Sequence, residues 1–115
     1  MCGICGIITT TNHASFDIFD ALLSLQHRGQ DACGIATSDG IYYNLRKGNG
    51  LLREMFDEEK LARMDGYMSI GHNRYPTAGG NHPKEAQPIF VNCPYGILLC
   101  HNGNLVNVEE LEKIL

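Results

Sequence analysis

The amino-terminal stretch MCGICGIITT, residues 1–10, carries a thiol directly after the first methionine. From Cys2 onward the stretch is rich in β-branched residues, which predicts a strand that begins almost at the amino terminus. If Met1 is removed, Cys2 carries a free α-amine as well as its thiol. An amine and a thiol on one residue form a nucleophile with its own general base. Cys2 is therefore a candidate nucleophile, although its position alone does not distinguish this role from an accident of composition.

The composition limits the possible classes of protein. The 115 residues are 43% hydrophobic and 19% charged, which fits one small globular domain or a piece of a larger one. The net charge of −4 indicates no partner among nucleic acids or anionic membranes. No apolar run approaches the roughly 18 residues of a membrane span, and no export signal is recognisable. We therefore expect a cytoplasmic protein whose five cysteines stay reduced.

Local patterns predict the remaining elements. A helix is expected over residues 15–29, with Ser15 as its N-cap, Asp17 in the first turn and Gly29 in the left-handed closing position. Two strands within residues 33–46 are expected to join at a turn formed by Asp39 and Gly40. The other expected elements are one or two short helices at 50–64, a strand at 67–72, a Gly/Pro-rich loop at 73–88, and paired strands at 88–92 and 95–101.

The carboxyl-terminal residues predict a helix from 108 to 115. Asn107 and Glu110 have the spacing of a capping box, which would open this helix. The helical pattern then reaches Leu115 without a glycine or another stop signal. The sequence therefore predicts a fragment of a longer domain rather than a complete one.

The C-x-x-C spacing of Cys2 and Cys5 is typical of a zinc half-site or a redox dithiol. Zinc needs four convergent ligands, and Cys93 and Cys100 are too far apart in sequence to form a second close pair, although histidines could supply nitrogens. Residues three apart in a strand point to opposite faces, so Cys2 and Cys5 could share neither a metal nor a bond. We expect Cys5, Cys33, Cys93 and Cys100 to be small buried apolar residues.

A second candidate site lies in the stretch GHNRYPTAGG, residues 71–80. Arg74 is expected in a loop directly after a strand, where ligands commonly bind. Its planar guanidinium can hold a carboxylate through two hydrogen bonds. An isolated arginine would be interpreted as structural, but Thr77 and the glycines after it would allow a ligand to approach the backbone closely.

Two further stretches are ambiguous. In HNGNL, Asn102 and Gly103 could form a hairpin turn, or they could aim a side-chain amide and a backbone N–H at one point as an oxyanion hole. The helical pattern that follows offers the hairpin no obvious partner strand. The stretch LQHRGQDACGI, residues 25–35, indicates only a structural corner on physical grounds.

Together and in this order, these stretches resemble the glutaminase domain of class II glutamine amidotransferases, which are amino-terminal-nucleophile hydrolases. The segments LQHRGQDA, RYPTAGG, EAQP and HNGNL are similar to those of the members that pass ammonia to phosphoribosyl pyrophosphate in the first step of de novo purine synthesis. Glucosamine-6-phosphate synthase is the second candidate, since it carries YRGYDSAG-like and RWATHG-like segments instead. A non-catalytic Cys/His metal-binding module is the candidate from another class.

The resemblance implies an α+β fold in which residues 1–115 form the amino-terminal half of a four-layer αββα sandwich. It implies that Cys2 becomes the nucleophile after Met1 is removed, with its own α-amine as the base. The other residues that it places around the substrate glutamine are Arg74, Thr77, Arg28 and Gly29 for binding and positioning, and Asn102 and Gly103 for the oxyanion.

The resemblance also implies parts that the 115 residues do not contain. These are the rest of the glutaminase domain, with a carboxylate for the α-amine of glutamine, and a phosphoribosyltransferase domain that uses Mg²⁺. Because Met1 alone precedes Cys2, a propeptide and an iron–sulfur cluster are not expected, and the segment itself needs no metal. The expected substrates are glutamine and phosphoribosyl pyrophosphate. The full-length enzyme is expected to be a homo-oligomer, and the isolated 115 residues to be inactive.

Overall fold

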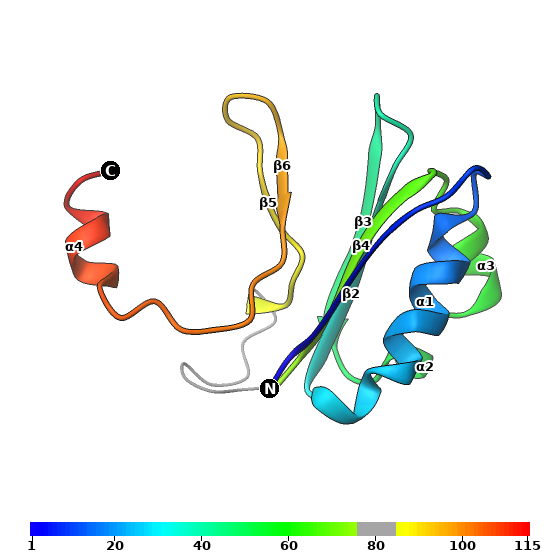
Figure 1. Ribbon diagram of the computed structural model, residues 1–115, viewed down its shortest axis with the longest axis horizontal. Helices are drawn as coiled ribbons and strands as arrows, with labels where there is room; N and C mark the ends of the chain where they lie inside the picture. Colours follow the sequence, from blue (N-terminus) through cyan, green and yellow to red (C-terminus); the bar gives the residue numbers. More distant parts are fainter. Residues whose placement is uncertain (76–84) are drawn as a thin grey trace.

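The computed structural model describes residues 1–75 and 85–115. It contains a four-stranded sheet with helices on one face and a two-stranded hairpin on the other (Figure 1). The large sheet has the order β1-β4-β2-β3, and all neighbouring strands are antiparallel. The strands are β1 Gly3–Ile8, β2 Ala32–Ser38, β3 Tyr43–Asn49 and β4 Met68–Arg74, and the hairpin is formed by β5 Ile89–Val91 and β6 Ile97–Leu99.

The hydrophobic core lies between the large sheet and its helices. The helices are α1 Ala14–Ser24, the 3-10 turn η1 Gln26–Arg28, α2 Leu52–Met55, α3 Glu58–Ala62 and, separately, α4 Val108–Glu112. The buried core residues are Ile18, Leu22, Cys33, Ile35, Leu52, Phe56, Leu61 and Met64. A Cβ on Gly71 of β4 would lie 2.4 Å from Leu22 Cδ1. The absent side chain at Gly71 therefore lets α1 pack closely on the sheet.

The pleat of β4 divides its side chains between the two faces of the sheet. Gly71 and Asn73 face α1, since the Asn73 side-chain amide donates to the carbonyl oxygen of Leu22 at 2.8 Å. His72 and Arg74 alternate with them and therefore face the hairpin. This second face therefore carries Arg74, which the sequence singled out, and His72, which it did not.

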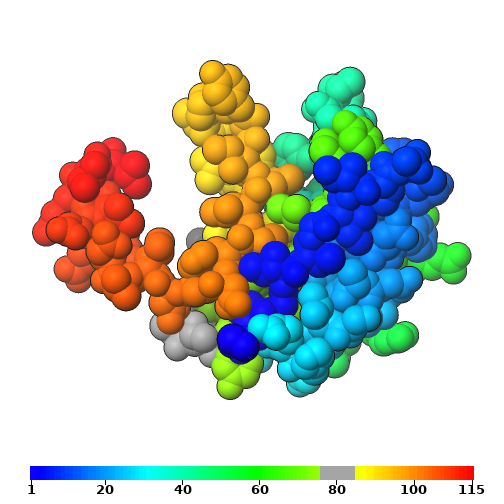
Figure 2. Space-filling model, viewed as in Figure 1, coloured from blue at the N-terminus to red at the C-terminus, as the bar shows by residue number. Residues whose placement is uncertain are grey.

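The β5–β6 hairpin packs on this second face. Phe90 of β5 lies against Tyr43 of β3, with ring centroids 4.5 Å apart. A cleft of about 440 Å³ separates β6 from the sheet, with Leu98 on one wall and Ile70 on the other. Helix α4 is exposed throughout and stands apart from the sheet, as the space-filling view in Figure 2 shows. No helix among the described residues is long and apolar enough to cross a membrane.

The turn and the short helices agree with the sequence. Asp39 Oδ1 accepts hydrogen bonds from the backbone N–H groups of Ile41 and Tyr42 at 2.8 and 2.7 Å, and Gly40 has a φ of 92°. This confirms the turn predicted at Asp39 and Gly40, where a short side chain accepts locally and a glycine takes a positive φ. Residues 50–64 form two short helices, α2 and α3, and the predicted strand pair is β5 and β6.

The predicted helix 15–29 is partly wrong. Helix α1 is shorter, and the separate turn η1 follows it. His13, not Ser15, occupies the N-cap position, and the buried Ser15 hydroxyl donates to the Leu61 carbonyl oxygen at 2.8 Å. A contact with α3 has therefore replaced the local cap. Gly29 is extended, with φ −163° and ψ 130°, and is not left-handed.

Two other expectations also need correction. The Asn107 side chain makes no capping hydrogen bond to α4, so the expected capping box is not formed. Cys33 is buried as expected, but Cys93 is exposed, and Cys5 and Cys100 are only half-buried. Burial raises the pKa of the Cys33 and Cys100 thiols to about 12. Both thiols therefore stay protonated at neutral pH and are poor nucleophiles.

Candidate active site

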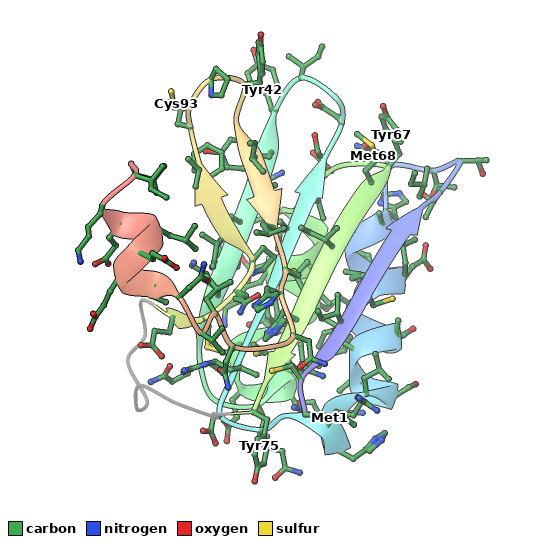
Figure 3. All side chains as sticks on the ribbon, turned by 60° about the vertical axis from the view of Figure 1, so that its left-hand side comes forward. Met1, Tyr42, Tyr67, Met68, Tyr75 and Cys93 are labelled. Carbon is green, nitrogen blue, oxygen red and sulfur yellow. The ribbon has the colours of Figure 1, made fainter. Side chains whose placement is uncertain are left out.

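Cys2 lies against the end of β4. The β1–β4 register pairs Gly3 with Asn73, and its continuation places Cys2 opposite Arg74. The Cys2 sulfur accepts from the backbone N–H of Tyr75 at 3.4 Å and donates to the Tyr75 carbonyl oxygen at 3.7 Å. Figure 3 shows Tyr75 at the same end of the sheet as the amino terminus. Cys2 is only 9% exposed, and its two contacts with the backbone of Tyr75 hold the thiol in place.

The thiols of Cys2 and Cys5 do not converge. Cys5 packs against the core cluster on the helical face, whereas the Cys2 sulfur contacts Tyr75. This geometry argues against both the zinc half-site and the redox dithiol. In residues 1–75 and 85–115, no group of three or more His, Cys, Asp or Glu side chains is placed to hold a metal ion.

Arg28 lies beside the amino terminus. Its Nε donates to the Cys2 carbonyl oxygen at 3.1 Å, and its Nη2 lies 3.8 Å from the Met1 sulfur. Arg28 is the last residue of η1, so the 3-10 turn after α1 brings a cation to the backbone of Cys2. Its positioning role in catalysis stays a prediction.

Gly29 lets the corner after η1 touch the end of β4. A Cβ on Gly29 would lie 2.6 Å from both the Arg74 carbonyl carbon and the Asn73 oxygen. Two hydrogen bonds fix the same corner, from Asp31 N–H to the Arg74 oxygen at 3.2 Å and from Gln26 Nε2 to the Gly29 oxygen at 2.6 Å. Because the extended backbone suits any residue, lack of space and not conformation requires glycine here.

We expect Gly29→Ala to destabilise the protein by about 1–3 kcal/mol, the usual effect of overpacking. The added methyl would meet backbone atoms, which cannot rotate away, and would displace Arg74. Thermal unfolding would measure the loss. Gly6→Ala is the matched control, since its Cβ would come no closer than 3.9 Å, to Ile70 Cγ2. Equal stability of the two variants would contradict the close approach.

Arg74 ends β4, so the expectation that it lies in a loop is wrong. The sheet extends two residues further than the sequence predicted. The Arg74 side chain is 9% exposed and forms an ion pair with the half-buried Glu85. This buried guanidinium lies on the hairpin side of the sheet, at the position opposite Cys2. Thr77, the other predicted glutamine ligand, lies outside the described residues.

Asn102 and Gly103 lie between β6 and α4, and both are exposed. The chain continues from them to α4 without pairing to any strand in the described residues, so the hairpin alternative is wrong. The backbone of the preceding residue, His101, is attached to the sheet. Its carbonyl oxygen accepts from His72 Nε2 at 3.2 Å, and its N–H donates to Gln87 Oε1 at 2.6 Å.

The sequence patterns did not single out His72 or Gln87 as site residues. Both lie inside stretches that carried the resemblance, GHNRYPTAGG and EAQP. Their place in these stretches was the sequence signal that could have identified them as site residues.

His72 is fully buried. Burial lowers its pKa, the hydrogen bond to His101 opposes this shift, and the charge of Arg74 adds to it. The net shift keeps the imidazole neutral at pH 7.

No protein-family model matches the chain. Its curated relatives and the solved structures that resemble it point to one class of protein. The chain is 54% identical over 98% of its length to the amidophosphoribosyltransferase of Pseudomonas aeruginosa. Over its whole length it is 53% identical to that of Escherichia coli and 49% identical to that of Saccharomyces cerevisiae. The chain spans only 22–23% of these three relatives.

Two solved structures match with similar coverage. One is the glutamine phosphoribosylpyrophosphate amidotransferase of B. subtilis complexed with ADP and GMP, with a TM-score of 0.83 and 34% identity. The other is described as the allosteric regulatory enzyme of purine biosynthesis, with a TM-score of 0.86 and 37% identity. Each match covers 99% of this chain and 24% of the other.

The class of protein that these matches share is the amidotransferases. More narrowly, the chain is homologous to the amino-terminal part of the amidophosphoribosyltransferases.

Proposed function

We propose that the chain is part of the glutaminase half of an amidophosphoribosyltransferase. The complete protein hydrolyses glutamine and passes the ammonia to phosphoribosyl pyrophosphate, which forms 5-phosphoribosylamine and releases pyrophosphate. The observation that carries the proposal is the placement of the Cys2 thiol at the end of β4, opposite the buried Arg74. The high identity to amidophosphoribosyltransferases favours this function over that of glucosamine-6-phosphate synthase.

In the first step, the α-amine of Cys2, freed by removal of Met1, takes the proton of the thiol. The sulfur then attacks the side-chain carbonyl carbon of glutamine, and the carbonyl electron pair moves to the oxygen. The Asn102 side-chain amide and the Gly103 N–H donate to this oxyanion. Their exposed position after β6 leaves them accessible to a substrate.

In the second step, the oxyanion re-forms the carbonyl and the carbon–nitrogen bond breaks. The ammonium group of Cys2 gives its proton to the departing nitrogen, which leaves as ammonia. A γ-glutamyl thioester remains on Cys2. Water then attacks the thioester, the amine again accepts and returns the proton, and glutamate leaves with the thiol restored.

The remaining site residues bind and orient glutamine. The guanidinium of Arg74, with Thr77, holds the α-carboxylate of the substrate, and the ion pair with Glu85 fixes the arginine side chain. Arg28 orients Cys2 through its carbonyl oxygen. Gly29 lets this corner approach the backbone of Arg74. The Cys2 sulfur and the Arg74 guanidinium that binds the substrate carboxylate are thereby held at a fixed separation. Attack by a nucleophile on a bound substrate requires this fixed geometry.

The proposal also covers the rest of the protein. Further chain completes the four-layer αββα sandwich and supplies a carboxylate for the α-amine of glutamine. A phosphoribosyltransferase domain binds phosphoribosyl pyrophosphate, and Mg²⁺ there would neutralise the charge of the pyrophosphate group. We propose a cytoplasmic homo-oligomer without an iron–sulfur cluster.

Two assays on the intact protein test the proposed function. Glutamate release from glutamine measures the glutaminase reaction. Pyrophosphate release from phosphoribosyl pyrophosphate should require either glutamine or added ammonia. If glutamine hydrolysis instead supported amination of fructose 6-phosphate, the protein would be a glucosamine-6-phosphate synthase. If glutamine were not hydrolysed at all, the glutaminase proposal would be wrong.

A further inference from the structure

The backbone of His101 is held at both of its polar groups. Its carbonyl oxygen accepts from His72 of β4, and its N–H donates to Gln87, which precedes β5. These two side chains come from segments far apart in the chain. Both attach the residue directly before Asn102 to the large sheet.

Gln87 is itself anchored on the sheet. Its carbonyl oxygen lies over Gly34 of β2, where a Cβ would come within 2.1 Å. The next residue, Pro88, accepts a hydrogen bond from Lys47 Nζ at 2.9 Å. Gly34 is also paired with His72 on the neighbouring strand. The register of the sheet therefore brings both partners of His101 to one place.

A buried histidine such as His72 is energetically unfavourable at a position with a purely structural role. It is fully buried, and among the described residues its Nδ1 has no hydrogen-bond partner. Burying an unpaired polar atom typically costs about 1–3 kcal/mol. The bond from Nε2 to the His101 oxygen fixes the Nε2–H tautomer, because a carbonyl oxygen can only accept. An apolar side chain would fill the same space without this penalty but could not hold His101.

We propose that His72 and Gln87 are positioning residues that fix the His101 peptide and so direct Asn102 and Gly103 at the oxyanion. The inference rests on the proposed glutaminase function and adds two residues to it. Neither side chain needs to touch glutamine. Their effect is therefore expected on the transition state, in which the oxyanion forms, more than on substrate binding.

The test uses His72→Leu and Gln87→Leu in the intact protein. Each variant removes one bond to His101, and we expect kcat for glutamate release to fall about ten- to a hundredfold, as small misplacements of catalytic groups do. The KM for glutamine should change less than about threefold. Formation of 5-phosphoribosylamine from added ammonia should be unchanged, because this reaction bypasses Asn102 and Gly103.

Conservative variants separate positioning from general damage. Gln87→Glu keeps the acceptor, and His72→Gln keeps a donor that reaches the place of Nε2, so both should restore most of kcat. Ser69→Ala is the matched control on β4. It removes a buried hydrogen bond of 2.8 Å to the Ala36 oxygen without touching His101. This control should lose stability but keep kcat.

The outcomes are distinguishable. If the unchanged protein shows no Cys2-dependent glutamate release, the proposed function itself fails. If the protein is active but both leucine variants keep kcat within twofold, or change only KM, the positioning role is wrong. Should His72→Leu fail to fold, the half-buried Gln87 decides the question, with Gln87→Glu as its reference.

Discussion

Replacement of Cys2 by alanine in the intact protein is expected to abolish glutamine hydrolysis while leaving ammonia-supported formation of 5-phosphoribosylamine intact. Removing a covalent nucleophile can lower kcat by roughly 10⁶-fold, which would place glutamate release below detection. No neighbouring thiol can substitute. Cys5 faces the helical core, and the pKa values of Cys33 and Cys100, raised to about 12, keep those thiols protonated.

The matched control is Cys93→Ala. Cys93 is exposed, and Figure 3 shows it near the tip of the β5–β6 hairpin, at the opposite end of the molecule from Tyr75. We expect this variant to retain full glutaminase activity. Persistent glutamate release from Cys2→Ala would require a different nucleophile, whereas loss of both activities would indicate that the substitution disrupts the fold.

The second large effect is expected from Asn102→Ala, which removes one donor to the oxyanion. Such a loss typically raises the barrier by about 2.7–4 kcal/mol, or lowers kcat roughly 10²–10³-fold. The oxyanion exists only along the reaction path, so the KM for glutamine should change little. Steady-state glutamate release over a range of glutamine concentrations measures both constants.

Asn107→Ala is the control for this substitution, because Asn107 is also exposed and makes no capping bond to α4. It should leave both constants unchanged. A change confined to KM in Asn102→Ala would instead make Asn102 a ground-state ligand of glutamine.

Elements specified by local interactions could be predicted from the sequence. The turn at Asp39 and Gly40 is an example, because a side chain accepts from its own neighbours and a glycine takes a positive φ. The strand that begins near Cys2 and the two short helices also followed from local patterns. The motifs further indicated Cys2, Arg28 and Arg74, which the structure places at one end of the sheet.

Features that depend on tertiary contacts could not be predicted. Serine is a residue type that commonly caps helices, but the Ser15 hydroxyl donates to the Leu61 carbonyl oxygen in α3 instead. Gly29 has the sequence context of a helix end, yet it is required because the backbone of Arg74 leaves no room for a Cβ. The link from His72 and Gln87 to His101 needs the strand order and register, which no short motif contains. Arg74 proved to belong to β4 because pairing with β2 continues through it.

The mass of the amino-terminal peptide, taken from the intact protein quenched in acid during turnover with glutamine, tests the role of Cys2 most directly. We predict a peptide that begins at Cys2 without Met1, a fraction of which carries one γ-glutamyl group on the thiol. The Asn102→Ala protein should also lack Met1 but accumulate less of this thioester. An active protein that retains Met1, or that carries the γ-glutamyl group on another residue, would contradict the role of Cys2 as nucleophile and base.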